Sequence, residues 1–181
     1  MGWGGVMAVS PGTDLPVLDL RRDNTVVTRS CLVRIEPGRV IPDADGNGVL
    51  HVAADGVVIR FAPGSALHGA DPDTPWDELR GVGIRIDGHR DVVLRDIRVH
   101  GFKCGVWASR ADGLRIEGGD ASDNFRQRLR STPWQEDAGD WLYPHHNDQR
   151  PWREEYGAAV CVERSRGVTI RDLRVRRTQN G

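Results

Sequence analysis

The sequence predicts an all-β fold in which short parallel strands stack into a solenoid, that is, a parallel β-helix. The first indication is an internal repeat, because residues 83–99 recur as residues 159–175, with a shorter third copy at residues 105–117. The offset from Gly83 to Gly105 is 22 residues, a period that usually indicates a solenoid. The second indication is the alternation of apolar and polar residues inside each copy, the pattern of a strand with one buried face.

The composition agrees with a single turn-rich β domain. The chain has 181 residues, with 22 glycines and 10 prolines. Its net charge of −1 provides no field that would gather nucleic acid, and no apolar run is long enough to insert into a membrane. The cysteines number three, are widely spaced and form no metal-binding pair, so we expect structural thiols.

The elements are expected in the following order. Residues 1–46 form an N-terminal lead-in or cap, and residues 47–181 form the coils of the solenoid. The expected strand segments are 25–28, 31–35, 49–52, 57–61, 83–86, 92–99, 105–108, 114–117, 159–162 and 168–175. Turn-forming residues separate these segments. Asn124 is expected to satisfy backbone donors in one of the turns.

A long loop insertion interrupts the coils at about residues 120–156. Gly105 aligns with Ala159, which lies much further along the chain than one repeat, so an extra segment separates these two copies. The insertion is rich in aromatic and charged side chains, which predicts an ordered loop packed on the sheet rather than a linker. Solenoid insertions usually cluster on the binding face.

The copies, with residues 168–175 running into Gln179-Asn180-Gly181, resemble the right-handed parallel β-helix proteins of the pectate-lyase-like superfamily, in particular the repeats shared by carbohydrate-binding proteins and sugar hydrolases. The resemblance covers residues 47–181 and concerns the fold rather than an activity. It implies that the β-helix is right-handed, that a substrate site lies on the outward face of one sheet, and that the protein is secreted or periplasmic. The first ten residues show no signal peptide, and a further coil is expected after Gly181, so we expect a fragment of a longer protein.

Aligning the coils places six side chains on the outward face where the resemblance puts the substrate. The row contains Arg85, Trp107 and Cys161, with Asp87, Ser109 and Glu163 beside it. Flat aromatic rings cover the C–H faces of sugars while charged groups bind the hydroxyls, so Arg85, Trp107 and Glu163 are candidates for substrate binding. The equally weighted alternative is that Trp107 only packs under the insertion.

The insertion holds the densest set of groups suited to catalysis. Glycoside hydrolysis needs two carboxyl groups, and β-elimination needs a base. Asp140, His145 and Asp148 are the catalytic candidates, with Glu136 and Lys103 equally eligible chemically, and Trp141, Tyr143 and Arg128 are further candidates for substrate binding. The alternative for most of them is ordinary solvated loop polarity, and we expect no metal site among them.

We expect no cofactor. Residues 43–48 are rich in oxygen ligands, as calcium loops are, but they lack the bidentate glutamate, so a plain turn is favoured over a calcium site.

The leading functional hypothesis is a protein that binds or processes polysaccharide, as a lyase or hydrolase would, whose partner is a polysaccharide or oligosaccharide. The alternative is a non-catalytic exported scaffold or protein-interaction module on the same solenoid. The sequence leaves open whether the protein is an enzyme.

Overall fold

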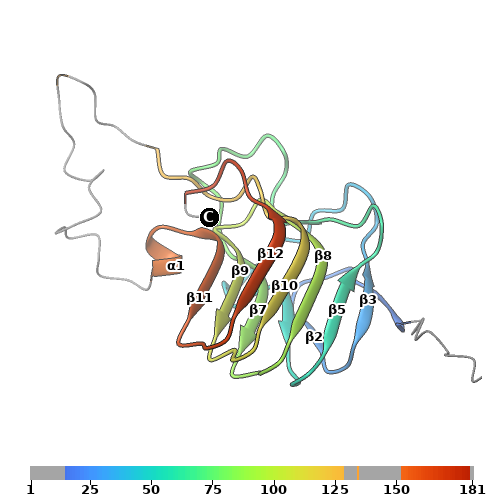
Figure 1. Cartoon of the computed structure of the whole chain (residues 1–181). Coiled ribbons are helices and arrows are strands. Elements are labelled where there is room, and N and C mark those ends of the chain that lie inside the picture. Colours follow the sequence, from blue (N-terminus) through green and yellow to red (C-terminus); the bar gives the residue numbers. More distant parts are fainter. Residues whose placement is uncertain (1–14, 129–133, 135–151, 180–181) are drawn as a thin grey trace, which may run out of the picture.

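The computed structural model describes residues 15–128, 134 and 152–179, and these are almost entirely strands and turns (Figure 1). The elements are β1 (Val17–Asp19), β2 (Thr25–Val27), β3 (Cys31–Arg34), β4 (Leu50–Val52), β5 (Val58–Phe61), β6 (Leu67–His68), β7 (Val82–Asp87), β8 (Val93–His100), β9 (Cys104–Ser109), β10 (Arg115–Asp120), the short helix α1 (Trp152–Glu155), β11 (Ala158–Glu163) and β12 (Thr169–Arg174). The predicted all-β class is confirmed. Within these residues, no helix has the length and apolar character needed to cross a membrane.

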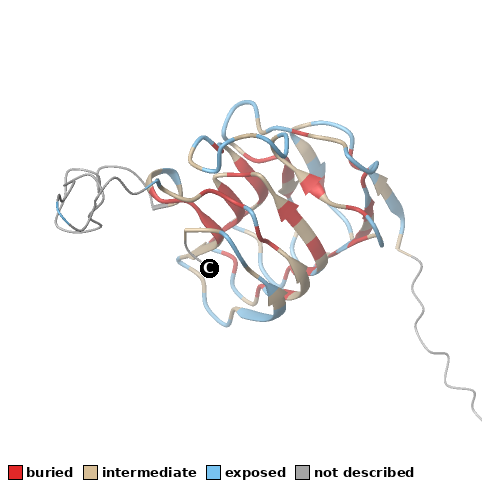
Figure 2. Ribbon diagram, turned by 90° about the horizontal axis from the view of Figure 1, so that it is seen from above, coloured by how far each residue is buried: buried red, intermediate tan, exposed pale blue. Residues whose placement is uncertain are grey.

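The strands form two main parallel sheets that face each other (Figures 1 and 2). Sheet A has the order β1-β3-β5-β8-β10-β12, with β6 also pairing with β8, and sheet B has the order β11-β9-β7-β4-β2. Every strand pair is parallel, and strands of the predicted N-terminal cap join the same two sheets. This arrangement is compatible with a β-helix-like solenoid.

The register of the strands reproduces the repeat seen in the sequence. Ile84 pairs with Val106, which pairs with Val160. These are the same partners that aligning the three copies in the sequence gives. The insertion therefore leaves the alignment of the flanking strands intact.

Residues in the left-handed region mark the same corner in successive copies. One such set is Asp96, Gly118 and Asp172, with φ of 51°, 73° and 56°. Glycine adopts this conformation freely, and aspartate tolerates it because its short side chain bonds the local backbone. The chain therefore bends at equivalent points within β8, β10 and β12, and these strands are in register on both sides of the bend.

The core lies between the two sheets (Figure 2). Ile84, Leu94, Val106 and Ile116 are completely buried there, and burying each such side chain contributes about 1.5–3 kcal/mol. Ile170 lies on β12, which is an edge strand of sheet A. It is 47% exposed because the described residues place no strand beyond β12.

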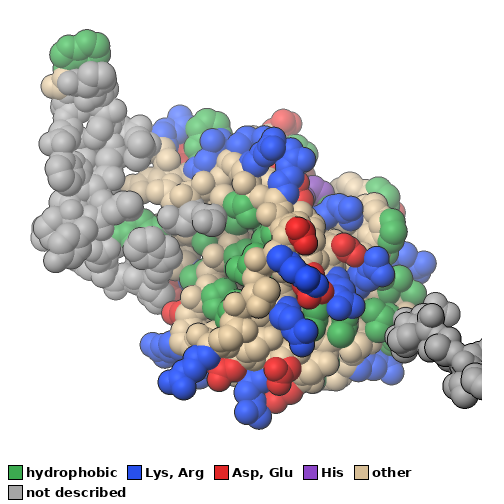
Figure 3. All heavy atoms as spheres, in the orientation of Figure 1, with side chains coloured by type: hydrophobic (Ala, Val, Ile, Leu, Met, Phe, Trp, Pro, Cys, Tyr) green, Lys and Arg blue, Asp and Glu red, His purple; other side chains and the backbone are tan. Residues whose placement is uncertain are grey.

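Ion pairs cross the outer face of sheet A, where Figure 3 shows acidic and basic side chains interleaved over β5, β8, β10 and β12. Glu117 is bonded to both Arg95 and Arg171 at 2.9 Å, and Arg60 is bonded to Asp96 at 2.8 Å. Charges on an exposed sheet face and at its edge oppose association with other strands.

Asn124 has the structural role that the sequence suggests. Its completely buried amide donates to the carbonyls of Val99 and Ala121 at 3.1 and 2.9 Å, and its Oδ1 accepts the N–H of Phe102 at 3.0 Å. One side chain thereby joins two successive turns.

Candidate functional site

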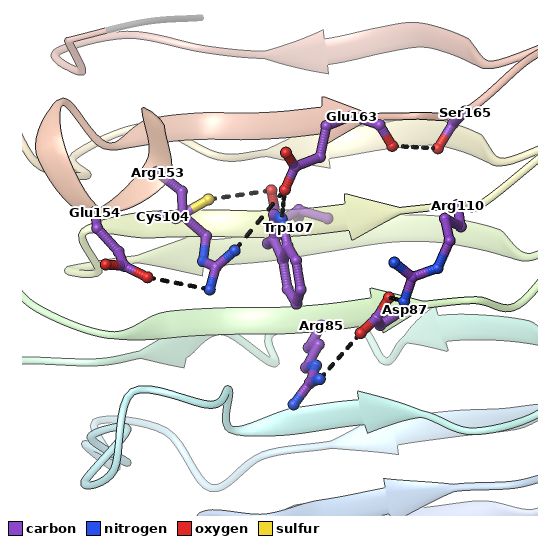
Figure 4. A network of polar contacts seen from close by, with 10 residues as sticks. Arg85, Asp87, Cys104, Trp107, Arg110, Arg153, Glu154, Glu163 and Ser165 are labelled. Atoms are coloured by element: carbon purple, nitrogen blue, oxygen red, sulfur yellow. Dashed lines mark hydrogen bonds and ion pairs between the residues drawn. The ribbon is translucent and has the colours of Figure 1, made fainter. Parts of the chain in front are cut away.

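The outer face of sheet B carries the predicted row of side chains (Figure 4). Arg85 on β7 pairs with Trp107 on β9, which pairs with Cys161 on β11. The neighbouring row of Asp87, Ser109 and Glu163 is aligned in the same way. The alternation of the strands thus brings residues far apart in sequence onto one surface.

Trp107 lies at the centre of this face, but its ring is covered. The guanidinium carbons of Arg85 and Arg153 lie 5.3 and 4.0 Å from the ring centroid, and the side chain is only 8% exposed. Its Nε1 donates a 2.6 Å hydrogen bond to Glu163. Arg153 belongs to α1, within the predicted insertion, so the geometry favours the alternative in which Trp107 packs beneath the insertion. A role of Trp107 in substrate binding stays a prediction.

The two carboxylates of the neighbouring row, Asp87 and Glu163, are both paired with arginine (Figure 4). Asp87 contacts Arg85 at 3.1 Å and also pairs with Arg110, while Glu163 lies 3.8 Å from Arg153. Asp87 and Glu163 are two strands apart, so their backbones are about 9–10 Å from each other.

A small apolar cluster adjoins Trp107 and is separate from the main core. It contains Val82, Cys104 and Ala158, with Cys161 packed against it. The pKa of the Cys161 thiol is raised by burial and then by the charge of Glu163, and burial likewise raises the pKa of Cys104. Both thiols are free and protonated at neutral pH, as expected for structural cysteines.

A groove of about 680 Å³ adjoins this cluster and α1. Its charged lining includes Asp77, Glu78, Arg80, Lys103, Arg153 and Glu154. Lys103, one of the chemically eligible bases, is thus placed in the groove, where its Nζ lies 3.4 Å from the centroid of the Phe125 ring. Arg153 lines the groove and also contacts Trp107 and Glu163, so the groove adjoins the outer face of sheet B.

Several predicted site residues cannot be placed on this surface. Asp140, His145 and Asp148, together with Trp141, Tyr143 and Glu136, lie outside the described residues.

Arg128 lies at the side of the groove. It pairs with Asp77 at 2.8 Å and stacks over Trp76 at 5.3 Å. The hydrogen bond from Arg128 lowers the pKa of Asp77, so this pair is ionic over a wide pH range.

The oxygen-rich loop at residues 43–48 has the hydrogen bonding of a turn. The side chain of Asp43 accepts backbone N–H bonds from Gly46, Gly48 and Val82 at 2.9, 3.0 and 2.7 Å. Its carboxylate lies near those of Asp23 and Asp45, with one oxygen of each within 4.8 Å of the others. Burial raises the pKa of Asp43 despite the three donors. The three N–H bonds to Asp43 hold the loop in its turn conformation.

Two residues of the site were missed by reasoning from the sequence. Arg110 has the same position in its copy as Gly88 has in the preceding copy, directly after the residue paired with Asp87. The repeat could therefore have placed Arg110 beside Asp87. Arg153 could not have been placed, because it lies within the insertion, to which the repeat assigns no register.

Comparison with protein-family models, curated proteins and solved structures finds no match for this chain.

Proposed function

We propose that the chain is a right-handed parallel β-helix of the pectate-lyase-like type, and that it binds polysaccharide along the outer face of sheet B and the adjoining groove. The observation that supports this is that Arg85, Trp107 and Glu163 lie together on this face, beside a groove of about 680 Å³. Arg85 is in register with Trp107, and Glu163 accepts a hydrogen bond from the Trp107 indole. A groove of this volume that offers both cations and carboxylates suits a ligand with many hydroxyl groups.

The proposal for this face is binding rather than hydrolysis. Glycoside hydrolysis needs two carboxyl groups that reach the glycosidic bond. Asp87 and Glu163 are both engaged by arginine side chains, with Asp87 3.1 Å from Arg85 and Glu163 3.8 Å from Arg153. Lys103 in the groove remains the candidate base for β-elimination.

The covered ring of Trp107 supports a second candidate, the non-catalytic exported scaffold. In that case α1 and its arginine complete a packed surface that contacts a protein partner rather than a sugar. Both candidate functions assume that the protein is exported to the periplasm or the exterior, and this assumption rests on the family resemblance.

The two candidates are distinguished by glycan binding of the whole chain. We expect a polysaccharide to be retained on a glycan array, and we expect Arg85→Gln and Trp107→Ala to weaken that binding at least about tenfold. The matched control is Arg60→Gln, which removes the same charge from the outer face of sheet A. Failure to bind any member of a broad panel, or unchanged binding in both variants, would favour the scaffold.

Assays for new reducing ends and for unsaturated uronate on the same panel address catalysis. Turnover that is abolished in Lys103→Ala while binding persists would identify a lyase. Turnover that survives in Lys103→Ala would exclude this lysine as the base.

A further inference from the structure

A second cleft, of about 410 Å³, lies beside the groove and shares Leu79 with it. It is formed by the loops after β6, β8, β10 and β12, which lie above the sheets in Figure 1 and carry many basic side chains in Figure 3. Its lining includes His68, Trp76, His100, Arg126 and Arg177. The volume is within the usual range of small-molecule sites, about 300–1,000 Å³.

Two arginines stack on the indole of Trp76, but they differ in their partners. The guanidinium carbon of Arg126 lies 4.6 Å from the ring centroid, and that of Arg128 lies 5.3 Å from it. Arg128 makes two bonds to Asp77, whereas the enclosed Nε of Arg126 has no hydrogen-bond partner among the described residues. An enclosed charged donor without an acceptor is costly, so Arg126 is the group in this cleft that most needs an anion.

Two histidines form another wall of the cleft. Their strands are paired in parallel, which places His68 directly beside His100 with ring centroids 5.3 Å apart. The Nδ1 of His100 lies 2.8 Å from the carbonyl oxygen of Ser122, and a carbonyl only accepts, so Nδ1 carries the hydrogen. Burial lowers the pKa of His68, and so does the charge of a protonated His100.

The acidic groups around the histidines are largely neutralised. Asp123 makes a two-pronged ion pair with Arg177 at 2.5 and 2.7 Å, and Asp120 lies 3.6 Å from Arg174. Asp71, at the exposed side of the cleft, is the remaining carboxylate of the lining. Among the described residues, the interior of the cleft thus presents one arginine whose Nε has no acceptor, together with the imidazoles of His68 and His100.

We propose that this cleft binds a small organic carboxylate, whose carboxylate group pairs with the guanidinium of Arg126 and accepts hydrogen bonds from the imidazoles of His68 and His100. Guanidinium and carboxylate have matching geometry and charge. A bound carboxylate favours the cationic form of the neighbouring His68 imidazole, so binding strengthens as the pH falls. The cleft shares Leu79 with the groove of the proposed polysaccharide site, but Arg126, His68 and His100 line only the cleft. The two proposals therefore depend on different side chains and are tested independently.

The test is calorimetric titration of the whole chain with glucuronate, with glucose as the neutral counterpart and inorganic phosphate as the other oxyanion. We expect saturable binding of glucuronate, none of glucose, weaker binding of phosphate, and affinity at least about threefold higher at pH 5.5 than at pH 7.5. The proposal is overturned if glucose binds equally well, if phosphate binds more tightly, if affinity is independent of pH, or if no glucuronate binding is observed.

Two variants assign the binding to these residues. Arg126→Gln should weaken glucuronate binding about tenfold or more at both pH values, and His68→Gln should remove most of the pH dependence. Arg60→Gln serves as the control for loss of one positive charge, and circular dichroism checks that each variant is folded. Equal affinities for Arg126→Gln and Arg60→Gln would overturn the proposal.

Discussion

Replacing Asn124 with alanine removes the side chain that joins two turns, and the cost follows from the bonds that it makes. The N–H of Phe102 loses its acceptor, and the carbonyls of Val99 and Ala121 each lose a donor, all in a completely buried site. A buried donor left without a partner costs about 1–3 kcal/mol, and carbonyls keep a second lone pair for other bonds. We therefore expect Asn124→Ala to lower the free energy of unfolding by about 3–4 kcal/mol.

Urea denaturation followed by circular dichroism measures this loss. With a slope of about 2 kcal/mol per M, the midpoint should fall by roughly 1.5–2 M. Asn24→Gly is the matched control: Asn24 lies in an exposed turn with φ of 59°, which glycine adopts freely, so its change should stay below about 0.5 kcal/mol. Asn124→Asp keeps the acceptor for Phe102 but buries a charge, so it should be at least as damaging as alanine. A midpoint for Asn124→Ala as high as that of the control would refute the reasoning.

Three further changes test other parts of the structure. Asp43→Ala leaves three backbone N–H groups without their acceptor, so a loss of about 3 kcal/mol is expected in the same urea assay, and a loss below about 1 kcal/mol would contradict the turn geometry. Glu163→Gln keeps an acceptor for the Trp107 N–H and should lower the stability by under about 0.5 kcal/mol in thermal melts, whereas Glu163→Leu should lower it by about 1–2 kcal/mol. Equal melting temperatures for the two variants would show that this hydrogen bond contributes nothing. The pKa of His68 is lowered from 6.5 in the folded state, so the unfolded chain binds the proton more strongly, and stability should fall as the pH drops below about 6.5. In thermal melts between about pH 5 and 8, His68→Gln should reduce this dependence of stability on pH. An unchanged pH dependence in the variant would contradict the burial of this imidazole.

The strand order and register could be predicted because they depend on a period that the sequence displays. Ile84, Val106 and Val160 are apolar at matching places in three copies, and parallel stacking places them beside one another. A shift by one residue would expose every buried side chain of a strand, so the register is strongly fixed. The same argument placed Arg85, Trp107 and Glu163 on one outer face.

What surrounds those side chains could not be predicted, because it comes from segments outside the repeat. The guanidinium of Arg153 covers Trp107 from the short helix α1 within the insertion. The second cleft was missed for a related reason. The spacing from His68 to His100 is not a multiple of the repeat, so the repeat does not align these two residues, although their strands pair directly.

The residues that open the copies explain why the repeat has the form that it does. Gly83 and Gly105 each lie against the carbonyl oxygen of the next copy, so a Cβ would come within 2.6 Å of the oxygen of Gly105 in one case and of Ala159 in the other. Such an approach is much closer than van der Waals contact, and only glycine permits it. The copy at residues 159–175 has Ala159 at this position, on β11, beyond which the described residues place no further strand of sheet B. Glycine is thus required at this position where another copy stacks on the strand. The glycine that opens a copy therefore indicates how closely the backbones of successive copies approach.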